Sequence, residues 1–356
     1  KVTEKIVPFM AAIYILGALT VILAHTENII PSFGRIFGDI FSGTAATGGF
    51  LGSTFAFAFT KGVGRGLYSN EAGQGSAAIA HSAARADEPV SEGMVAILEP
   101  FIDTLVICTI TGLAVLASGA WNEKVDNVFQ RADMEIVAGV WSESDPAHVE
   151  QLAAHLSHAG SDRIAPFDGE LVVERGALAP GQGLTVIHAR SLAEDLVFTR
   201  GGEPLDGRLR VARGQIEDSG VTIRGRSLVH SAVLTAEAFK RGWLGDRGQF
   251  VVALGLLLFA FSTVISWSYY GDRAVTYLVG ARFVLPYRIA YVAAFFAAAL
   301  ADTTVVWSLA AVAIVLMAVP NLLGILLLHK EMKQTVADYW VKFKREHQGD
   351  IARLKL

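Results

Sequence analysis

The chain has 356 residues, of which 52% are hydrophobic and 18% are charged, and its formal net charge is −4. Soluble globular proteins carry about 25% charged residues, so this composition argues against an ordinary soluble protein. The small net charge gives no indication of a nucleic-acid partner, and we expect none. We predict a polytopic membrane protein whose main partner is the lipid bilayer.

In chain order, several segments have the length and apolarity of membrane-spanning helices, each of which needs about 20 mostly apolar residues. A further segment, residues 36–60, is apolar but interrupted by small and hydroxylated residues. We therefore expect six spans, one of them broken. The five uninterrupted segments are residues 6–24, 93–116, 250–270 and a pair within 287–328 separated near Asp302.

The interruption of the 36–60 segment points to function. Gly43, Gly48 and Gly49 permit the helix to unwind, and Thr44 and Thr47 supply hydroxyl oxygens. Irregular backbone at membrane depth is tolerated only beside protein or a filled cavity. Half-helix ends at this depth hold small zwitterions and coupling ions in many secondary transporters. We expect the binding site of the protein at this break.

Residues 69–76 follow as a polar and glycine-rich stretch. Ser69 or Asn70 has the character of a helix N-cap, with Glu71 beside the positive end of the helix dipole. No GxxxxGK[ST] motif is present, so we do not expect a phosphate-binding loop. Glu99 and Asp103, spaced i, i+4 in the next span, could relay protons or attract cations, because buried carboxylates usually face the interior of a helix bundle. We favour a structural or gating role for them.

Residues 122–230 form a region without an apolar span. Short β-rich runs alternate there with turn signals, and a helix is expected over 147–158. We predict a small, mainly β soluble domain. His148, His155 and His158 invite a metal-site interpretation, but their spacing is better explained by a solvated helix face, so we expect no metal site there. The expected strands are residues 171–174, 184–188, 196–199, 208–211 and 221–224.

The 250–270 span is unusually polar. Helical spacing places Ser262 and Ser266 on one face, with Thr263 and Trp267 on an adjacent face. Hydroxyl and carbonyl oxygens are the ligands that a hard cation such as Na⁺ prefers. Hydrogen bonding between helices, with Trp267 in an aromatic belt, explains the same residues. Spacing alone leaves both interpretations open.

Basic loops indicate the orientation. Lys and Arg residues between the broken span and residue 93, between 270 and 290, and after residue 328 fall on one side if six spans alternate, and that side is the cytoplasm. We therefore divide the chain into spans at 1–121 (with the broken helix at 36–60 and a helix at 93–117), an extracytoplasmic insert at 122–230, spans at 231–328 and a cytoplasmic basic tail at 329–356. The location is the plasma membrane, or the inner membrane of a Gram-negative cell.

Several motifs in the same order resemble the alanine or glycine:cation symporter family, the sodium:alanine symporters. They are Thr44-Ala-Ala-Thr-Gly-Gly-Phe50, the stretch from Gly64 to His81, Leu98-Glu-Pro-Phe-Ile-Asp-Thr104 and the stretch from Phe259 to Gly271. The resemblance implies sodium-driven uptake of alanine or glycine, with Na⁺ as coupling ion and no cofactor. It also implies an all-α inverted-repeat fold of the leucine-transporter type, present here in part.

The same resemblance implies roles for individual residues. Substrate would be bound by Ala46, Thr47, Gly48, Gly49, Phe50, Thr263 and Trp267, and sodium would lie nearest Ser262 and Thr263. The residues themselves, rather than the resemblance, suggest that Asn70, Glu71, Glu99 and Asp103 are structural or gating residues. The family has about eleven spans and a short connection where this chain has its insert. We therefore expect a fragment of a longer protein, with the family pattern resuming at about 231–239.

Two other classes of function remain as alternatives. One is a membrane-anchored sensor whose outer insert binds a ligand, and the other is a proton-coupled amino-acid transporter that uses Glu99 and Asp103. The insert shows no nucleophile–base pair by sequence, so we do not expect an enzyme.

Overall fold

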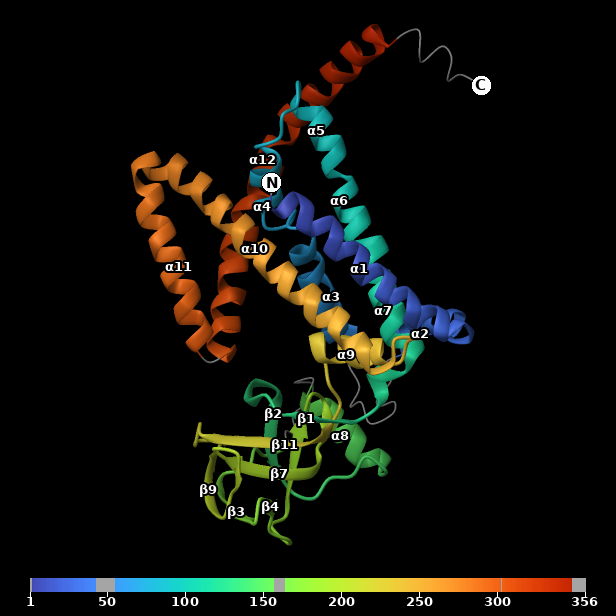
Figure 1. The fold of residues 1–356 in the computed structure, drawn as a ribbon, viewed down its shortest axis with the longest axis vertical. Helices are drawn as coiled ribbons and strands as arrows, with labels where there is room; N and C mark the ends of the chain where they lie inside the picture. The colour runs from blue at the N-terminus through green and yellow to red at the C-terminus, as the bar shows by residue number, and fades with distance from the viewer. Residues whose placement is uncertain (1, 43–54, 157–163, 302, 348–356) are drawn as a thin grey trace. The chain divides into compact units, whose positions relative to one another are not determined.

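A computed structural model describes residues 2–42, 55–156, 164–301 and 303–347. The chain, whose course is drawn in Figure 1, divides into two compact units, the first made of residues 1–61 and 110–262 and the second of residues 62–109 and 263–356. The boundaries fall inside helices α3 (Phe55–Ser69), α7 (Cys108–Ser118) and α10 (Gly248–Val279). Each of these helices therefore contributes one end to each unit.

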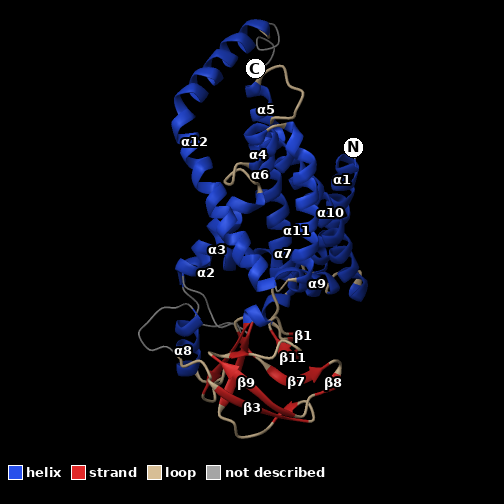
Figure 2. Cartoon of the chain, turned by 90° about the vertical axis from the view of Figure 1, so that its left-hand side faces the viewer, coloured by secondary structure: helices blue, strands red, loops and turns tan. Residues whose placement is uncertain are grey.

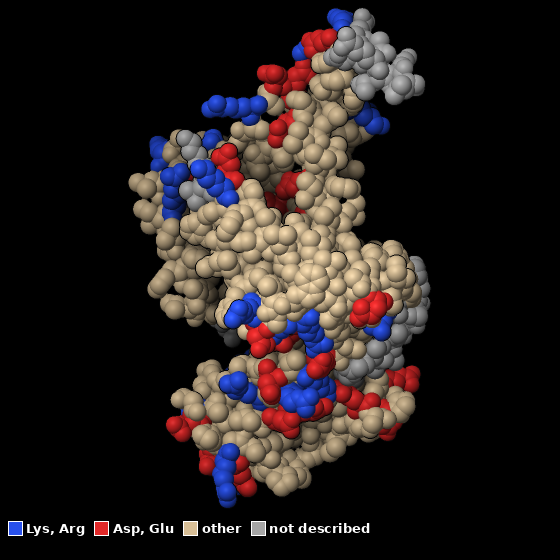
Figure 3. Space-filling view, turned by 45° about the vertical axis from the view of Figure 1, so that its right-hand side comes forward, with Lys and Arg blue, Asp and Glu red and all other residues tan. Residues whose placement is uncertain are grey.

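Among the described residues, five helical segments are long and apolar enough to cross a membrane. They coincide with the five uninterrupted spans predicted from the sequence, which are therefore confirmed as helices of spanning length. Their apolar side chains stay largely exposed, and the face drawn in Figure 3 carries broad areas without Lys, Arg, Asp or Glu. Such surfaces need lipid or further protein to cover them. The segments are Thr3–Ala24, Pro89–Ser118, Gly245–Val279, Ala281–Leu300 and Val305–Glu346.

The predicted break in the sixth span lies outside the described residues. Helix α2 (Ile29–Ser42) precedes the segment 43–54, and α3 follows it. The described helices extend beyond the predicted bounds of 36–60, to Ile29 on one side and to Ser69 on the other. The break itself stays a prediction.

In the first unit, helices α1 (Val2–Ala24), α7, α9 (Ser231–Lys240) and α10 share one apolar core. Val21 and Phe239 are almost completely buried in it. Gly17 makes the close packing possible, because a Cβ atom there would lie 2.8 Å from Val251 and 2.9 Å from Phe239. The Tyr14 hydroxyl is 2.8 Å from the Thr111 hydroxyl, so α1 and α7 are also joined by a hydrogen bond. Small residues and hydroxyl pairs are the usual means of packing helices in membranes.

The insert is strand-rich, as predicted (Figure 2). Its described residues form an eight-stranded antiparallel sheet in the order β1-β11-β7-β4-β3-β9-β10, with β8 paired to β7, and a three-stranded sheet in the order β2-β5-β6. All five predicted strands are present, and the predicted helix is α8 (Pro146–Leu156). The strands are β1 (Val125–Val128), β2 (Met134–Ala138), β3 (Gly169–Glu174), β4 (Ala177–Leu178), β5 (Leu184–His188), β6 (Ser191–Leu192), β7 (Glu194–Arg200), β8 (Glu203–Pro204), β9 (Gly207–Ala212), β10 (Gln215–Ile216) and β11 (Val221–Ser227).

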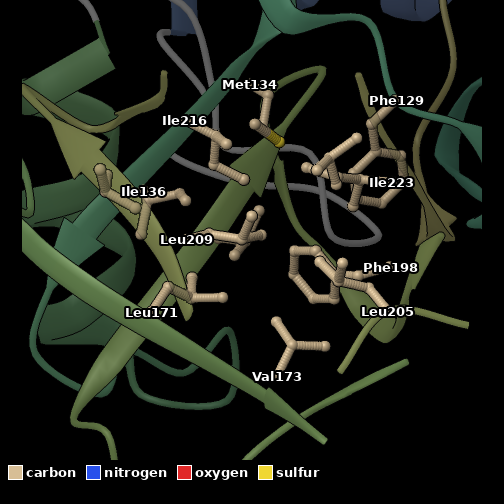
Figure 4. Close-up of a cluster of buried hydrophobic side chains, with 13 residues drawn as sticks. Phe129, Met134, Ile136, Leu171, Val173, Phe198, Leu205, Leu209, Ile216 and Ile223 are labelled. Carbon is tan, nitrogen blue, oxygen red and sulfur yellow. The ribbon is translucent and has the colours of Figure 1, made fainter. Parts of the chain in front are cut away.

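Alternating hydrophobicity explains why these segments are strands. In β11 every second residue is buried, because side chains along a strand point to opposite faces. Val221 and Ile223 thus enter the core, whereas Thr222 and Arg224 are exposed. Figure 4 shows Phe198 and Leu209 pointing toward a common centre in this core. The insert therefore has a hydrophobic core of its own.

In the second unit, a turn joins α3 to the short helix α4 (Ser76–His81), and α5 (Pro89–Ala96), α6 (Leu98–Pro100) and the π-helix η2 (Phe101–Ile107) follow. Pro100 has no amide N–H to donate, which favours a local change in helix geometry at this point. Helices α11 (Val284–Leu300) and α12 (Thr303–Glu346) complete the unit. The 44 residues of α12 run without interruption from the last span through the first part of the basic tail.

Candidate functional site

The polar stretch 70–75 forms a tight turn between α3 and α4. The Asn70 side chain donates to the Gly66 carbonyl oxygen at 3.1 Å and accepts from the Ala72 amide at 3.2 Å. Glu71 has a φ of 57°, which is rare outside glycine. The helix predicted to begin at Ser69 or Asn70 instead begins at Ser76. That expectation was wrong because the Asn70 side chain caps its own turn, an alternative that asparagine offers to the backbone.

Glu71 is tied to α10. The indole N–H of Trp267 donates to a Glu71 carboxylate oxygen over 3.1 Å. The same ring lies 5.9 Å, between centroids, from the ring of Tyr270. A hydrogen bond from a neutral donor to a charged acceptor in a helix bundle contributes about 1.5–3 kcal/mol. Trp267 therefore has a partner in the turn 70–75, in addition to the pocket role predicted for it.

Asn321 ties the same turn to α12. Its side-chain amide group donates to the Ala72 carbonyl oxygen at 2.9 Å and to the Gly73 carbonyl oxygen at 3.0 Å. Gly75 makes this approach possible: its φ is 84°, and a Cβ atom there would lie 2.8 Å from the Asn321 Oδ1 atom. The turn is thus held by side chains from two membrane-spanning helices. Sequence reasoning missed Asn321, because a single amide in a long apolar helix does not reveal its partner 248 residues earlier.

The predicted gating carboxylates both have partners. The Ser69 hydroxyl donates to Asp103, which lies in the π-helix η2. Glu99 pairs with His81 Nε2 at 3.2 Å, and the other ring nitrogen pairs with Glu92 at 2.7 Å. The hydrogen bond with Glu92 raises the pKa of His81, against the effect of partial burial, and Glu99 raises it further. Asp103 therefore joins the Pro89–Ser118 segment to α3, and Glu99 joins the same segment to α4.

The predicted sodium residues lie next to each other in α10. Ser262 is buried, and its hydroxyl donates to the Phe259 carbonyl oxygen of its own helix at 2.9 Å. The oxygen retains a lone pair that a cation can use. Thr263 is half-buried. The predicted substrate residues Ala46, Thr47, Gly48, Gly49 and Phe50 lie outside the described residues, so their proximity to Thr263 and Trp267 stays a prediction.

The histidines of the insert have ordinary polar partners. His155 Nε2 lies 3.1 Å from a carboxylate oxygen of Glu135, and His148 Nε2 lies 3.8 Å from Asp145. His158 is outside the described residues. Within the described ranges no group of three or more His, Cys, Asp or Glu side chains is arranged to hold a metal ion.

A serine–histidine pair that the sequence did not reveal lies in the insert. His188 Nδ1 is 2.7 Å from the Ser227 hydroxyl, and His188 Nε2 accepts from the Gln130 amide at 3.2 Å. Burial is the main cause that lowers the pKa of His188 to about 4. The neutral ring therefore carries its proton on Nδ1 and donates it to Ser227, which in turn donates to the Leu228 carbonyl oxygen. A base that donates to its serine cannot activate it, so this pair is structural.

Comparison with known proteins shows the family of the chain. The profile of the sodium:alanine symporter family matches residues 1–144 and 218–353. The chain belongs to this family. Residues 145–217, which include most strands of the insert, lie outside the match, whereas the turn 70–75, Trp267 and Asn321 all lie within it. The candidate site is thus part of the symporter portion of the chain.

Individual relatives in this symporter family are similar over much or part of the chain. The sodium/alanine symporter AgcS of Methanococcus maripaludis is 29% identical over 92% of this chain and 49% of its own length. The sodium/proton-dependent alanine carrier protein of Bacillus sp. PS3 is 26% identical over 97% of this chain and 57% of its own length. The probable sodium/glutamine symporter GlnT of Bacillus subtilis is 38% identical over 34% of this chain and 25% of its own length.

The chain spans about half the length of the curated relatives that it matches over most of its residues. No solved structure matches it.

Proposed function

We propose that the complete protein carries a small neutral amino acid, alanine or glycine, across the plasma membrane together with sodium. The observation that supports this most strongly is the polar turn 70–75, held among spanning helices of a sodium:alanine symporter by Trp267 and Asn321. Polar groups within membrane helices are costly and usually mark the path of a solute.

Substrate and sodium are assigned to adjacent positions. The amino acid binds at Ala46, Thr47, Gly48, Gly49 and Phe50 with Thr263 and Trp267, and sodium binds nearest Ser262 and Thr263. Sodium orders the broken helix and so creates the pocket for the charged groups of the amino acid. Release of sodium into the cytoplasm, where it is dilute, weakens the pocket and frees the substrate.

The proposed mechanism is alternating access on a leucine-transporter-type inverted repeat. The turn 70–75 is attached to α10 by Trp267 and Tyr270 and to α12 by Asn321, and these few side-chain hydrogen bonds can be exchanged during a cycle. In this proposal the insert 122–230 is extracytoplasmic and the tail 329–356 is cytoplasmic. Asn70, Glu71, Glu99 and Asp103 act as gating or structural residues.

The test is uptake of labelled alanine by the full-length protein in proteoliposomes, with and without a sodium gradient. Thr263→Ala should raise the sodium concentration needed for half-maximal uptake about tenfold, the effect of losing about 1.4 kcal/mol of binding. Thr276→Ala removes the same kind of hydroxyl from the same helix, where it donates to the Asp272 carbonyl oxygen, and as the matched control it should stay within about twofold. Alanine uptake that is unchanged when sodium is removed would refute the proposal.

Proton coupling is a second candidate, favoured by one observation. His81 bridges Glu92 and Glu99, so three titratable groups are joined in one network. If protons drive transport, a pH gradient should support uptake in sodium-free medium, and His81→Gln should abolish that uptake. Uptake that needs sodium and survives His81→Gln would reject this candidate.

A further inference from the structure

Two buried side-chain oxygens in the second unit lack hydrogen-bond partners among the described residues. They are the Oε1 atom of Gln74 and the Oγ atom of Ser76. Gln74 is 5% exposed and Ser76 is 2% exposed. A buried polar atom without a partner costs about 1–3 kcal/mol, so each of these two atoms calls for a ligand or a water molecule.

The two residues flank Gly75, where the Asn321 side chain leaves no room for a Cβ atom. Both N–H groups of the Asn321 amide are directed at carbonyl oxygens of the turn, those of Ala72 and Gly73. The Asn321 Oδ1 atom therefore remains an acceptor, and it lies 2.8 Å from the position of a Cβ atom on Gly75. Gln74 and Ser76 thus flank the glycine that Asn321 contacts, and all three side chains carry an oxygen that can accept.

The charge of this turn decides what kind of ligand fits. Glu71 contributes a carboxylate, and the two donors that reach it, the indole of Trp267 and the hydroxyl of Tyr270, are both neutral. The groups around the turn are therefore oxygens with excess negative charge. An anion or the carboxylate of a substrate would be repelled, whereas a hard cation takes oxygen ligands of this kind.

We propose that the turn 70–76 binds a sodium ion of its own through Glu71, Gln74, Ser76 and Asn321. This inference rests on the proposed sodium-coupled function. It adds a second sodium site, none of whose residues lies in α10, to the site proposed at Ser262 and Thr263. The bound ion offsets the charge of Glu71 and links the turn to α12. Sodium then stabilises the arrangement in which α10 and α12 hold the turn.

The first test uses the full-length wild-type protein and hydrogen–deuterium exchange. Amides of residues 70–82 should exchange more slowly in sodium buffer than in N-methylglucamine buffer of the same ionic strength. Equal exchange in the two buffers, as expected if a water molecule satisfies the two oxygens, would overturn the proposal. Because this measurement needs no substitution, it holds even where a variant fails to fold.

The second test measures binding of radioactive sodium to purified variants. Gln74→Leu and Ser76→Ala should each weaken sodium binding about tenfold, and Ser82→Ala, at the end of the same short helix, should stay within about twofold. Folded variants that bind sodium like the wild type would overturn the proposal. The outcomes separate the two proposals. If uptake depends on sodium but the variants bind sodium as the wild type does, only this site is rejected. If sodium slows amide exchange in the turn but uptake does not depend on sodium, only the coupling is rejected.

Discussion

The buried histidine of the insert should make this domain sensitive to acid. His188 is 4% exposed, stacks on Phe129 at 4.2 Å between ring centroids, and is neutral in the fold. Protonation of His188 would place a charge in the core. It would also break the hydrogen bond in which His188 Nε2 accepts from the Gln130 amide. Burial lowers the pKa of His188 from 6.5 to about 4, Asp133 opposes that change, and His230 adds to it.

The sign and the size follow from that difference. Because the folded pKa is lowered, the unfolded insert binds the proton more readily, so stability is complete above about pH 6.5 and falls as the pH drops toward 4. Each pKa unit corresponds to about 1.36 kcal/mol, so the full loss is about 3 kcal/mol, and about 2 kcal/mol is lost at pH 5. A loss of this size is a large part of the stability of a small domain.

The assay is hydrogen exchange in the full chain, corrected for the intrinsic pH dependence of exchange. It should follow the amides of β5 and β11, which contain His188 and Ser227. In the wild type the free energy of opening should decrease as the pH is lowered. His188→Gln should be less stable at neutral pH, but its free energy of opening should depend less on pH. His148→Gln is the control, because it removes a partly exposed histidine from the same insert. An equal slope in the wild type and in His188→Gln would refute the reasoning.

Further predictions concern the helical part. Trp267→Phe removes the donor to Glu71 and should slow alanine uptake by about tenfold, which corresponds to about 1.4 kcal/mol, and uptake at the wild-type rate would count against the role of this bond. Gly75→Ala places a Cβ atom against Asn321 and an alanine in a left-handed conformation, which costs about 1–2 kcal/mol, so the melting temperature should fall, and an unchanged value would contradict the observed turn. Asp272→Asn weakens a bidentate ion pair with an arginine of α11 and should lower the melting temperature, more so at low salt; equal values for the two proteins would argue against the pair.

Local patterns were sufficient for much of the architecture. Twenty-residue apolar segments predicted the five described spans, because a bilayer selects length and hydrophobicity almost regardless of neighbours. Alternation with a period of two predicted the strands of the insert, since each strand buries one face. The helix start at Ser69 or Asn70 was wrong, because asparagine can close a turn as readily as it caps a helix.

The sequence by itself therefore determined the class of the protein, its spans, its β insert and its family, all of which depend on periodicity and on motifs read along the chain. Tertiary structure alone decided which groups meet: Asn321 with Ala72 and Gly73, Trp267 with Glu71, and His188 with Ser227. These contacts join residues tens to hundreds of positions apart. Their geometry depends on how helices and strands pack, and no local pattern carries that information.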